Sequence, residues 1–122
     1  MKELKIYYPE SLVLTTDLNP ELAPACHFAD KSIKVGLYND PDYISILLKH
    51  SLQNNVKLII PTLDTELALL SRHREMFNKM GIEIILSTEQ FLHICHDKYL
   101  TAKFFNQYEI RTPKIYNPSK LG

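Results

Sequence analysis

Short runs of strand-forming residues alternate with longer runs of helical periodicity, and this alternation limits the folds open to the chain. Strand-like runs fall at residues 11–16, 32–35, 56–60 and 82–86, and residues 114–116 can form one more. Apolar residues recur at helical spacing from 41 to about 54, from the 62–64 stretch to 81, after 87, and from about 98 to 107. Strands and helices that alternate with short connections are typical of βαβ units. The sequence therefore predicts an α/β domain with a parallel sheet.

Residues at the ends of these runs indicate where the helices begin and end. Asp40 followed by Pro41 predicts a helix start, with Asp40 as the N-cap and Pro41 at the first helical position. Gly81 predicts the end of the next helix. Ser87, with Gln90 three residues later, predicts a capping box. The first eight residues fit either the last turns of a helix or a strand.

Composition excludes several classes of protein. The 122 residues are enough for one ordinary domain and too few for two. Because 14 Lys and Arg balance 14 Asp and Glu, we expect neither a nucleic-acid-binding domain nor a polybasic membrane module. No apolar run approaches the roughly 20 residues that span a bilayer. The first eight residues alternate charged and apolar types, so we expect no signal peptide. Cys26 and Cys95 form no CxxC pair, so we expect a reduced, cytoplasmic protein.

Two polar stretches directly follow predicted strands, where a parallel sheet presents its ligands. Asp17 and Asn19 come after the first strand, and an acidic residue at this place can bind a ribose hydroxyl. The same residues, followed by Pro20, are also ordinary turn formers. The sequence leaves both roles open.

The second stretch offers Thr62, Asp64 and Glu66 around the start of a helix. Hydroxyl and carboxylate groups beside free helix N–H groups suit an anion or a polar substrate. Alternatively, Thr62 or Asp64 caps the helix and Glu66 interacts favourably with its dipole. Because both stretches follow strands, we expect them on one rim of the sheet.

Histidines and cysteines do not form a catalytic or metal-binding pattern. His93 and His96 are three residues apart, but no third ligand is evident. Cys95 beside His96, and Cys26 beside His27, are adjacent in sequence only, which does not make a nucleophile and base pair. The glycine-rich phosphate-binding motifs are absent. We therefore expect no metal site and assign no catalytic residue.

Three parts of the chain resemble a known family in their residues, their order and their spacing. They are residues 16–25 (TDLNPELAPA) with 28–31 (FADK), residues 60–67 (IPTLDTEL), and residues 97–101 (DKYLT) with 112–114 (TPK). They resemble the N-terminal, pre-ATP-grasp domain of ATP-grasp ligases, and most of all the proteins similar to the carbamoyl-phosphate synthase large subunit. On its own, Asp97 before Lys98 indicates only an N-cap next to an exposed lysine.

The resemblance implies a Rossmann-like three-layer parallel sheet and a share in a ligase reaction. In that class, ATP and magnesium activate a carboxylate as an acyl phosphate, which a nitrogen nucleophile then attacks. The family motif assigns Lys98 to nucleotide binding, and a mobile point charge suits phosphate oxygens. It assigns Asp17 and Asn19, with Thr62, Asp64 and Glu66, to the substrate side of the cleft.

The chain also departs from the family pattern. It lacks the usual first strand, so we expect an open sheet that a partner chain or a second copy can join. Residues 1–116 are expected to form the pre-ATP-grasp domain, and residues 117–122 to begin a linker to an ATP-grasp domain that this chain does not contain. We therefore expect no tightly bound ATP and no activity from the chain alone.

A second hypothesis places the chain in another class. It could be a free-standing, non-catalytic α/β module that binds a small ligand or a partner protein. Such a module would have a closed sheet and no apolar docking face, whereas a ligase fragment would expose one.

Overall fold

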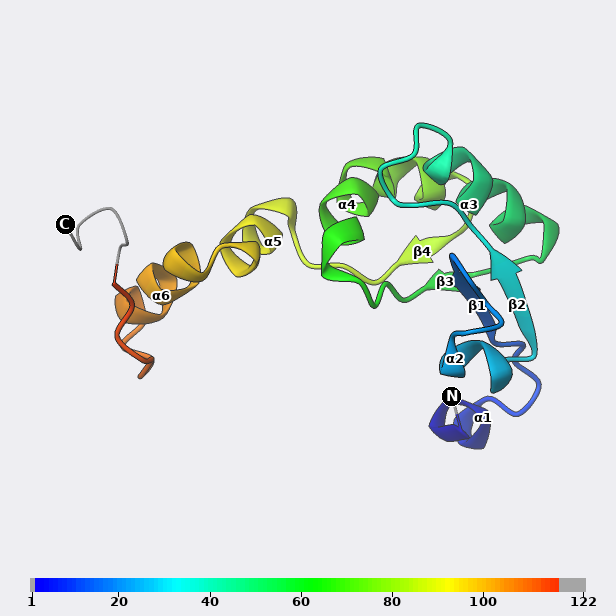
Figure 1. Ribbon diagram of the computed structural model, residues 1–122, viewed down its shortest axis with the longest axis horizontal. Coiled ribbons are helices and arrows are strands. Elements are labelled where there is room, and N and C mark those ends of the chain that lie inside the picture. The colour runs from blue at the N-terminus through cyan, green and yellow to red at the C-terminus, as the bar shows by residue number, and fades with distance from the viewer. Residues whose placement is uncertain (1, 117–122) are drawn as a thin grey trace. The chain divides into compact units, whose positions relative to one another are not determined.

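The structure is a computed structural model that describes residues 2–116 (Figure 1). Its contacts divide it into two compact units, the first ending at Asn54 and the second beginning at Asn55. The elements are α1 (Lys2–Tyr7), β1 (Leu14–Asp17), α2 (Pro24–His27), β2 (Lys31–Lys34), α3 (Tyr43–Gln53), β3 (Leu58–Ile59), α4 (Asp64–Lys79), β4 (Glu83–Ile84), α5 (Glu89–His96) and α6 (Lys98–Gln107).

Each unit contains one pair of parallel strands within the described residues. The predicted mixed α/β class with parallel strands is therefore confirmed. The continuous three-layer sheet stays a prediction, as does the single domain over residues 1–116. The linker expected at residues 117–122 lies outside the described residues.

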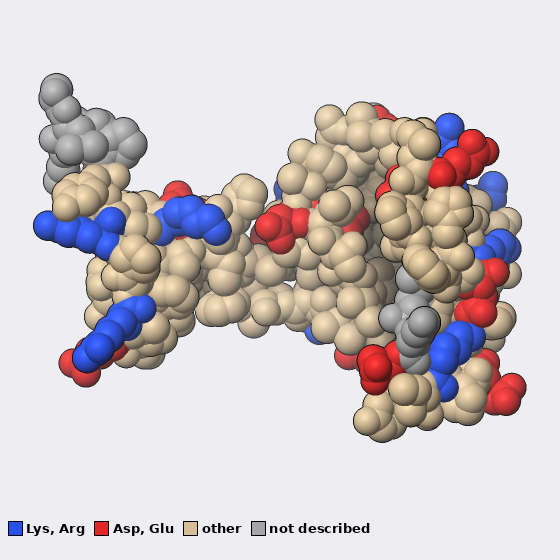
Figure 2. All heavy atoms as spheres, turned by 60° about the horizontal axis from the view of Figure 1, so that its bottom comes forward, with Lys and Arg blue, Asp and Glu red and all other residues tan. Residues whose placement is uncertain are grey.

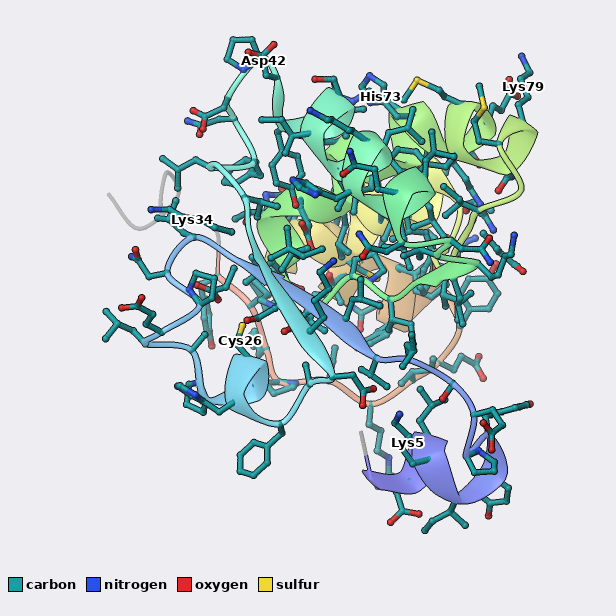
Figure 3. All side chains as sticks on the ribbon, turned by 90° about the vertical axis from the view of Figure 1, so that its right-hand side faces the viewer. Lys5, Cys26, Lys34, Asp42, His73 and Lys79 are labelled. Carbon is teal, nitrogen blue, oxygen red and sulfur yellow. The ribbon has the colours of Figure 1, made fainter. Side chains whose placement is uncertain are left out.

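The first unit is built on the β1–β2 pair, whose register runs from Leu14 opposite Lys31 to Asp17 opposite Lys34. The crossover between these strands contains α2, a short helix that the apolar pattern did not predict. Cys26 of α2 is buried, and the Thr15 hydroxyl donates a hydrogen bond to its Sγ atom over 3.3 Å (Figure 3). This contact attaches α2 to the strand that precedes it.

Helix α1 settles the ambiguity of the opening residues, because residues 2–7 are helical. Its Lys5 (Figure 3) forms a salt bridge of 2.8 Å to Asp30, which lies just before β2. The Lys5 ammonium also donates to the Ser11 carbonyl oxygen, and the Val13 amide donates to the Asp30 carboxylate over 2.7 Å. The Asp30 carboxylate thus binds both Lys5 of α1 and Val13, the residue before β1.

We expect the Asp30→Asn variant to melt at a lower temperature than the wild type at neutral pH. The hydrogen bond from Lys5 and that from the Val13 amide lower the pKa of Asp30 below its ordinary value of 3.8. A lowered pKa in the folded state stabilises the fold above the unfolded pKa, and this stabilisation is lost as the pH falls through the folded pKa. The difference in Tm should therefore be constant above about pH 5 and shrink below pH 4.

The matched control is Asp42→Asn, since Asp42 is the N-cap of α3 but its side chain makes no capping bond in the described structure. Thermal unfolding of the wild type and both variants across this pH range is the measurement. A Tm difference for Asp30→Asn that did not change with pH would contradict the ion pair as its cause.

The second unit contains β3, β4 and the long helix α4. Leu58 of β3 lies opposite Glu83 of β4, and Ile59 lies opposite Ile84. The core contains four side chains that are almost wholly inaccessible to solvent: Leu70, Phe77, Ile82 and Ile84.

Gly81 ends α4 as predicted. Its φ of 74° is in the left-handed region that glycine adopts without strain. The Gly81 amide donates to the Asn78 carbonyl over 3.0 Å, and the Ile82 amide donates to the Phe77 carbonyl over 3.0 Å. This pair of bonds is a Schellman motif, and it brings the buried residues Phe77 and Ile82 together at the start of β4.

Two predicted helix starts are wrong. Helix α3 begins at Tyr43, after Pro41, and the Asp40 carboxylate accepts instead from the Leu37 amide over 2.8 Å. Helix α5 begins one residue later than a capping box at Ser87 requires, and the Thr88 hydroxyl accepts from the Phe91 amide over 3.3 Å. At α5 the neighbouring hydroxyl of Thr88 takes the capping role expected of Ser87, whereas at α3 the N-cap Asp42 makes no side-chain capping bond.

The runs at residues 11–16, 32–35, 56–60 and 82–86 each overlap a strand, although most strands are shorter than their runs. Residues 56–60 contribute only Leu58–Ile59 and residues 82–86 only Glu83–Ile84, because only these residues pair. The strand predicted at residues 114–116 is wrong, since this segment has no regular structure.

Candidate functional site

Asp17 and Asn19 form a turn at the end of β1. Asp17 is the last residue of the strand, and its Oδ1 atom accepts from the Asn19 amide over 2.8 Å. The Asp17 carbonyl accepts from the Val35 amide over 3.0 Å, just beyond the end of β2. This side chain therefore has the turn-forming role that the sequence allowed. Its role as a ligand for substrate stays a prediction.

Thr62, Asp64 and Glu66 lie around the start of α4, but neither Thr62 nor Asp64 is its N-cap. The cap is Leu63, in an extended conformation with φ −106° and ψ 121°. Thr62 precedes the cap and Asp64 follows it, so the predicted capping role of both is wrong. Asp64 and Glu66 are in the first turn, where negative charge interacts favourably with the helix dipole.

These three side chains differ in accessibility. Thr62 and Asp64 are exposed, so both can meet a ligand from solvent. Glu66 is 9% exposed and is counted among the buried polar residues. A substrate would therefore meet Thr62 and Asp64 before Glu66.

Lys98 is the first residue of α6, and its side chain is exposed. The preceding Asp97 is the N-cap, and its Oδ1 atom accepts from the amides of Tyr99 over 2.7 Å and Leu100 over 3.1 Å. The predicted cap and the predicted bounds of this helix, 98–107, are both confirmed. The Asp97 carboxylate is thus engaged with the backbone, and Lys98 is exposed beside this capped helix start.

The predicted site residues fall into three local groups. Asp17 and Asn19 share one turn of the first unit. Thr62, Asp64 and Glu66 share one helix start in the second unit, and Lys98 begins a different helix there. The common rim for the two loops stays a prediction, because the loops belong to different units.

Two hollows in the second unit contain none of the predicted site residues. One, of about 380 Å³, is lined by Lys57, Arg74, Asn78, Gly81, Ile82 and Glu83. The other, of about 510 Å³, is lined by Tyr99, Ala102, Lys103, Asn106, Thr112, Pro113, Lys114 and Ile115. The sequence signal for the second hollow is a local excess of lysine and arginine from residue 98 onward. The balanced total charge of the chain conceals this local excess.

Across residues 2–116, no three His, Cys, Asp or Glu side chains gather closely enough to hold a metal ion. Cys26 and Cys95 are free thiols, the first buried and the second exposed. In the same described part of the chain, no helix has the length and apolar character needed to cross a membrane.

Parallel strand pairs and polar turns after the strands define this protein as a small α/β domain. The chain belongs to the PylC-like N-terminal domain family, whose model matches residues 2–85. This is a pre-ATP-grasp domain, associated with ATP-grasp proteins. The match includes Asp17, Asn19, Thr62, Asp64 and Glu66, and it ends before Lys98. No curated protein matches the chain.

Proposed function

We propose that this chain is the substrate-side N-terminal domain of an ATP-grasp carbon–nitrogen ligase. The observation that carries the proposal is the family match over residues 2–85. The motifs at residues 16–25, 60–67 and 97–101 favour an enzyme that resembles the carbamoyl-phosphate synthase large subunit. In such an enzyme, ATP with magnesium supplies the phosphoryl group that activates a carboxylate for attack by a nitrogen nucleophile.

In this proposal, Lys98 binds a phosphate oxygen of the nucleotide. Its exposed ammonium group at the start of α6 fits this role, because a lysine acts as a mobile point charge toward phosphate. The Asp97 cap keeps the helix start in place while the lysine side chain moves. Magnesium is assigned to carboxylates of the ATP-grasp domain, since residues 2–116 bring together no metal-binding cluster.

The turn at Asp17 and Asn19 and the start of α4 would line the substrate side of the cleft. Asn19 and Thr62 present uncharged polar groups, and Asp17 and Asp64 present carboxylates, which suit a substrate with hydroxyl or amino groups. We propose that both loops meet on one rim of a Rossmann-like three-layer sheet. The parallel register of both strand pairs supports this arrangement.

Exposed apolar side chains support a docking face for the ATP-grasp domain. In the second unit, Leu58, Ile60 and Ile85 are 43%, 58% and 53% exposed, respectively. All three belong to β3, β4 or the residues that directly follow them. Exposed apolar side chains gathered at strands mark an interaction surface, which a partner chain, an ATP-grasp domain or a second copy would fit. The two free thiols favour the cytoplasm.

The test combines the full chain with a separately purified ATP-grasp domain of the same enzyme. We expect association by light scattering, and ATP hydrolysis that requires both proteins and an amine acceptor. We expect titration of the chain alone with magnesium–ATP to show no tight binding. Tight binding of ATP by a monomeric chain, or no association and no hydrolysis with the partner, would contradict the proposal and favour a free-standing binding module.

A further inference from the structure

We propose that the hollow between α6 and residues 112–115 is a binding site for a ligand that carries phosphate groups. Five of its lining residues have polar side chains: Tyr99, Lys103, Asn106, Thr112 and Lys114. Its volume of about 510 Å³ is within the range of small-molecule sites. Lys98 does not line it, so this inference does not rest on the proposed function.

The backbone around α6 forms the hollow by turning the chain back on itself. Glu109 has a φ of 56°, and the Ile110 amide donates to the Phe105 carbonyl over 2.8 Å. The Glu109 amide also donates to the Asn106 carbonyl over 3.3 Å. This is the bonding pattern of a Schellman motif, here with glutamate where glycine is usual. The turn brings residues 112–115 alongside the helix, so that both line the hollow.

Aromatic contacts hold α6 in this position. The ring of Phe104 lies edge-on to Phe91 of α5, with centroids 5.7 Å apart. The same ring is 4.7 Å from that of Tyr108, at the C-terminal end of α6. Such aromatic pairs add to the stabilisation from burial. Lys103, one of the two lysines of the hollow, is therefore carried by a helix that packs on α5 through Phe104.

The charge of the hollow favours an anion. Lys103 and Lys114 contribute two ammonium groups, and no acidic residue is among the lining residues in the described structure. Figure 2 shows several lysine or arginine side chains, with acidic side chains beside them, at the α6 end of the second unit. The Lys114 ammonium is also 5.1 Å from the centre of the Tyr116 ring, a cation–π contact that restricts it.

The uncharged lining residues suit the oxygens of a phosphate group. The Tyr99 and Thr112 hydroxyls and the Asn106 amide can each donate a hydrogen bond. Hydrogen bonds to a charged acceptor are about twice as strong as bonds between neutral groups. By contrast, the hollow that contains Lys57 and Arg74 also contains the carboxylate of Glu83, which would repel an anion.

The test titrates the full chain calorimetrically with pyrophosphate and, separately, with ADP, both without magnesium. We expect the K103Q/K114Q variant to bind pyrophosphate at least tenfold more weakly than the wild type. The matched control is K49Q/K79Q, which removes the same charge from two exposed lysines outside the hollow and should bind like the wild type. Thermal unfolding checks that all three proteins are folded.

Amide chemical shifts provide a second measurement that does not depend on the variants. Pyrophosphate should shift the signals of residues 99–115 in the wild type. Equal binding of ADP and pyrophosphate would identify the ligand as a phosphate compound without a base and would leave the proposed function intact. Tighter binding of ADP would identify the ligand as a nucleotide, and it would contradict the proposed function, in which the chain alone binds no nucleotide tightly. The proposal is overturned by the absence of binding to the wild type, by equal losses in both double variants, or by shifts elsewhere in the chain only.

Discussion

The Phe77→Ala variant is expected to lose about 3–5 kcal/mol of unfolding free energy, the typical effect of removing a large aromatic side chain from a packed core. The Phe77 side chain is 0% exposed, so its removal leaves a cavity in the protein interior. Its carbonyl also accepts the bond from Ile82 that completes the end of α4. Because domains of this size are stable by only about 5–15 kcal/mol, such a loss would remove a large fraction of the total stability.

Urea unfolding followed by circular dichroism measures this loss. The matched control is Phe28→Ala, since Phe28 is 75% exposed and its replacement should change stability by about 0.5 kcal/mol or less. Similar losses in the two variants would show that Phe77 does not fill a core. A large loss for Phe77→Ala alone confirms that the helix and the strand after it share one packed interior.

The Lys98→Gln variant is expected to raise the KM for ATP of the assembled ligase about 10- to 100-fold, the effect of losing a hydrogen bond of about 1.5–3 kcal/mol to a charged group. This expectation rests on the proposed function. Lys98 is exposed and is not the cap of α6, so its replacement should leave the Tm of the chain unchanged. A rise in KM with an unchanged Tm would therefore indicate a lost ligand contact rather than a damaged fold.

Steady-state kinetics at varied ATP concentration gives KM and kcat separately. Lys49→Gln is the control, because Lys49 is an exposed lysine in the middle of α3, away from the predicted site. An unchanged KM for Lys98→Gln would remove Lys98 from the nucleotide site. It would leave the family membership intact, since the match ends before this residue.

The sequence predicted the helices best where a single residue determines the end. The Asp97 carboxylate accepts from two free amides at the start of α6, and Gly81 adopts the left-handed backbone conformation that ends α4. Helix α6 and the end of α4 therefore lie where the sequence predicts them. The Asp40 carboxylate instead binds the Leu37 amide in the preceding turn, and Thr88 instead of Ser87 caps α5, so both predicted caps were misplaced. Helix α2, with four residues, is too short to show a periodic pattern.

The candidate site was less predictable than the elements that carry it. The sequence placed Asp17 at the end of a strand and Lys98 at a helix start, because both positions depend on local signals. Which loops meet depends on the order of strands in a sheet, and hydrophobic periodicity does not encode that order. The hollow at Lys103 and Lys114 was missed because a turn after α6, with glutamate in the left-handed region, brings its two walls together.

The parallel pairs have a consequence for how the chain acquires its structure during synthesis. Each residue of β1 pairs with one 17 positions further along, and each residue of β3 with one 25 positions further along. Both pairings lie within a single unit, and the entropy cost of closing a loop grows only slowly with its length. The β1–β2 pair can therefore assemble on the ribosome while the second unit is still being translated, so early folding should proceed from the N-terminus in two steps.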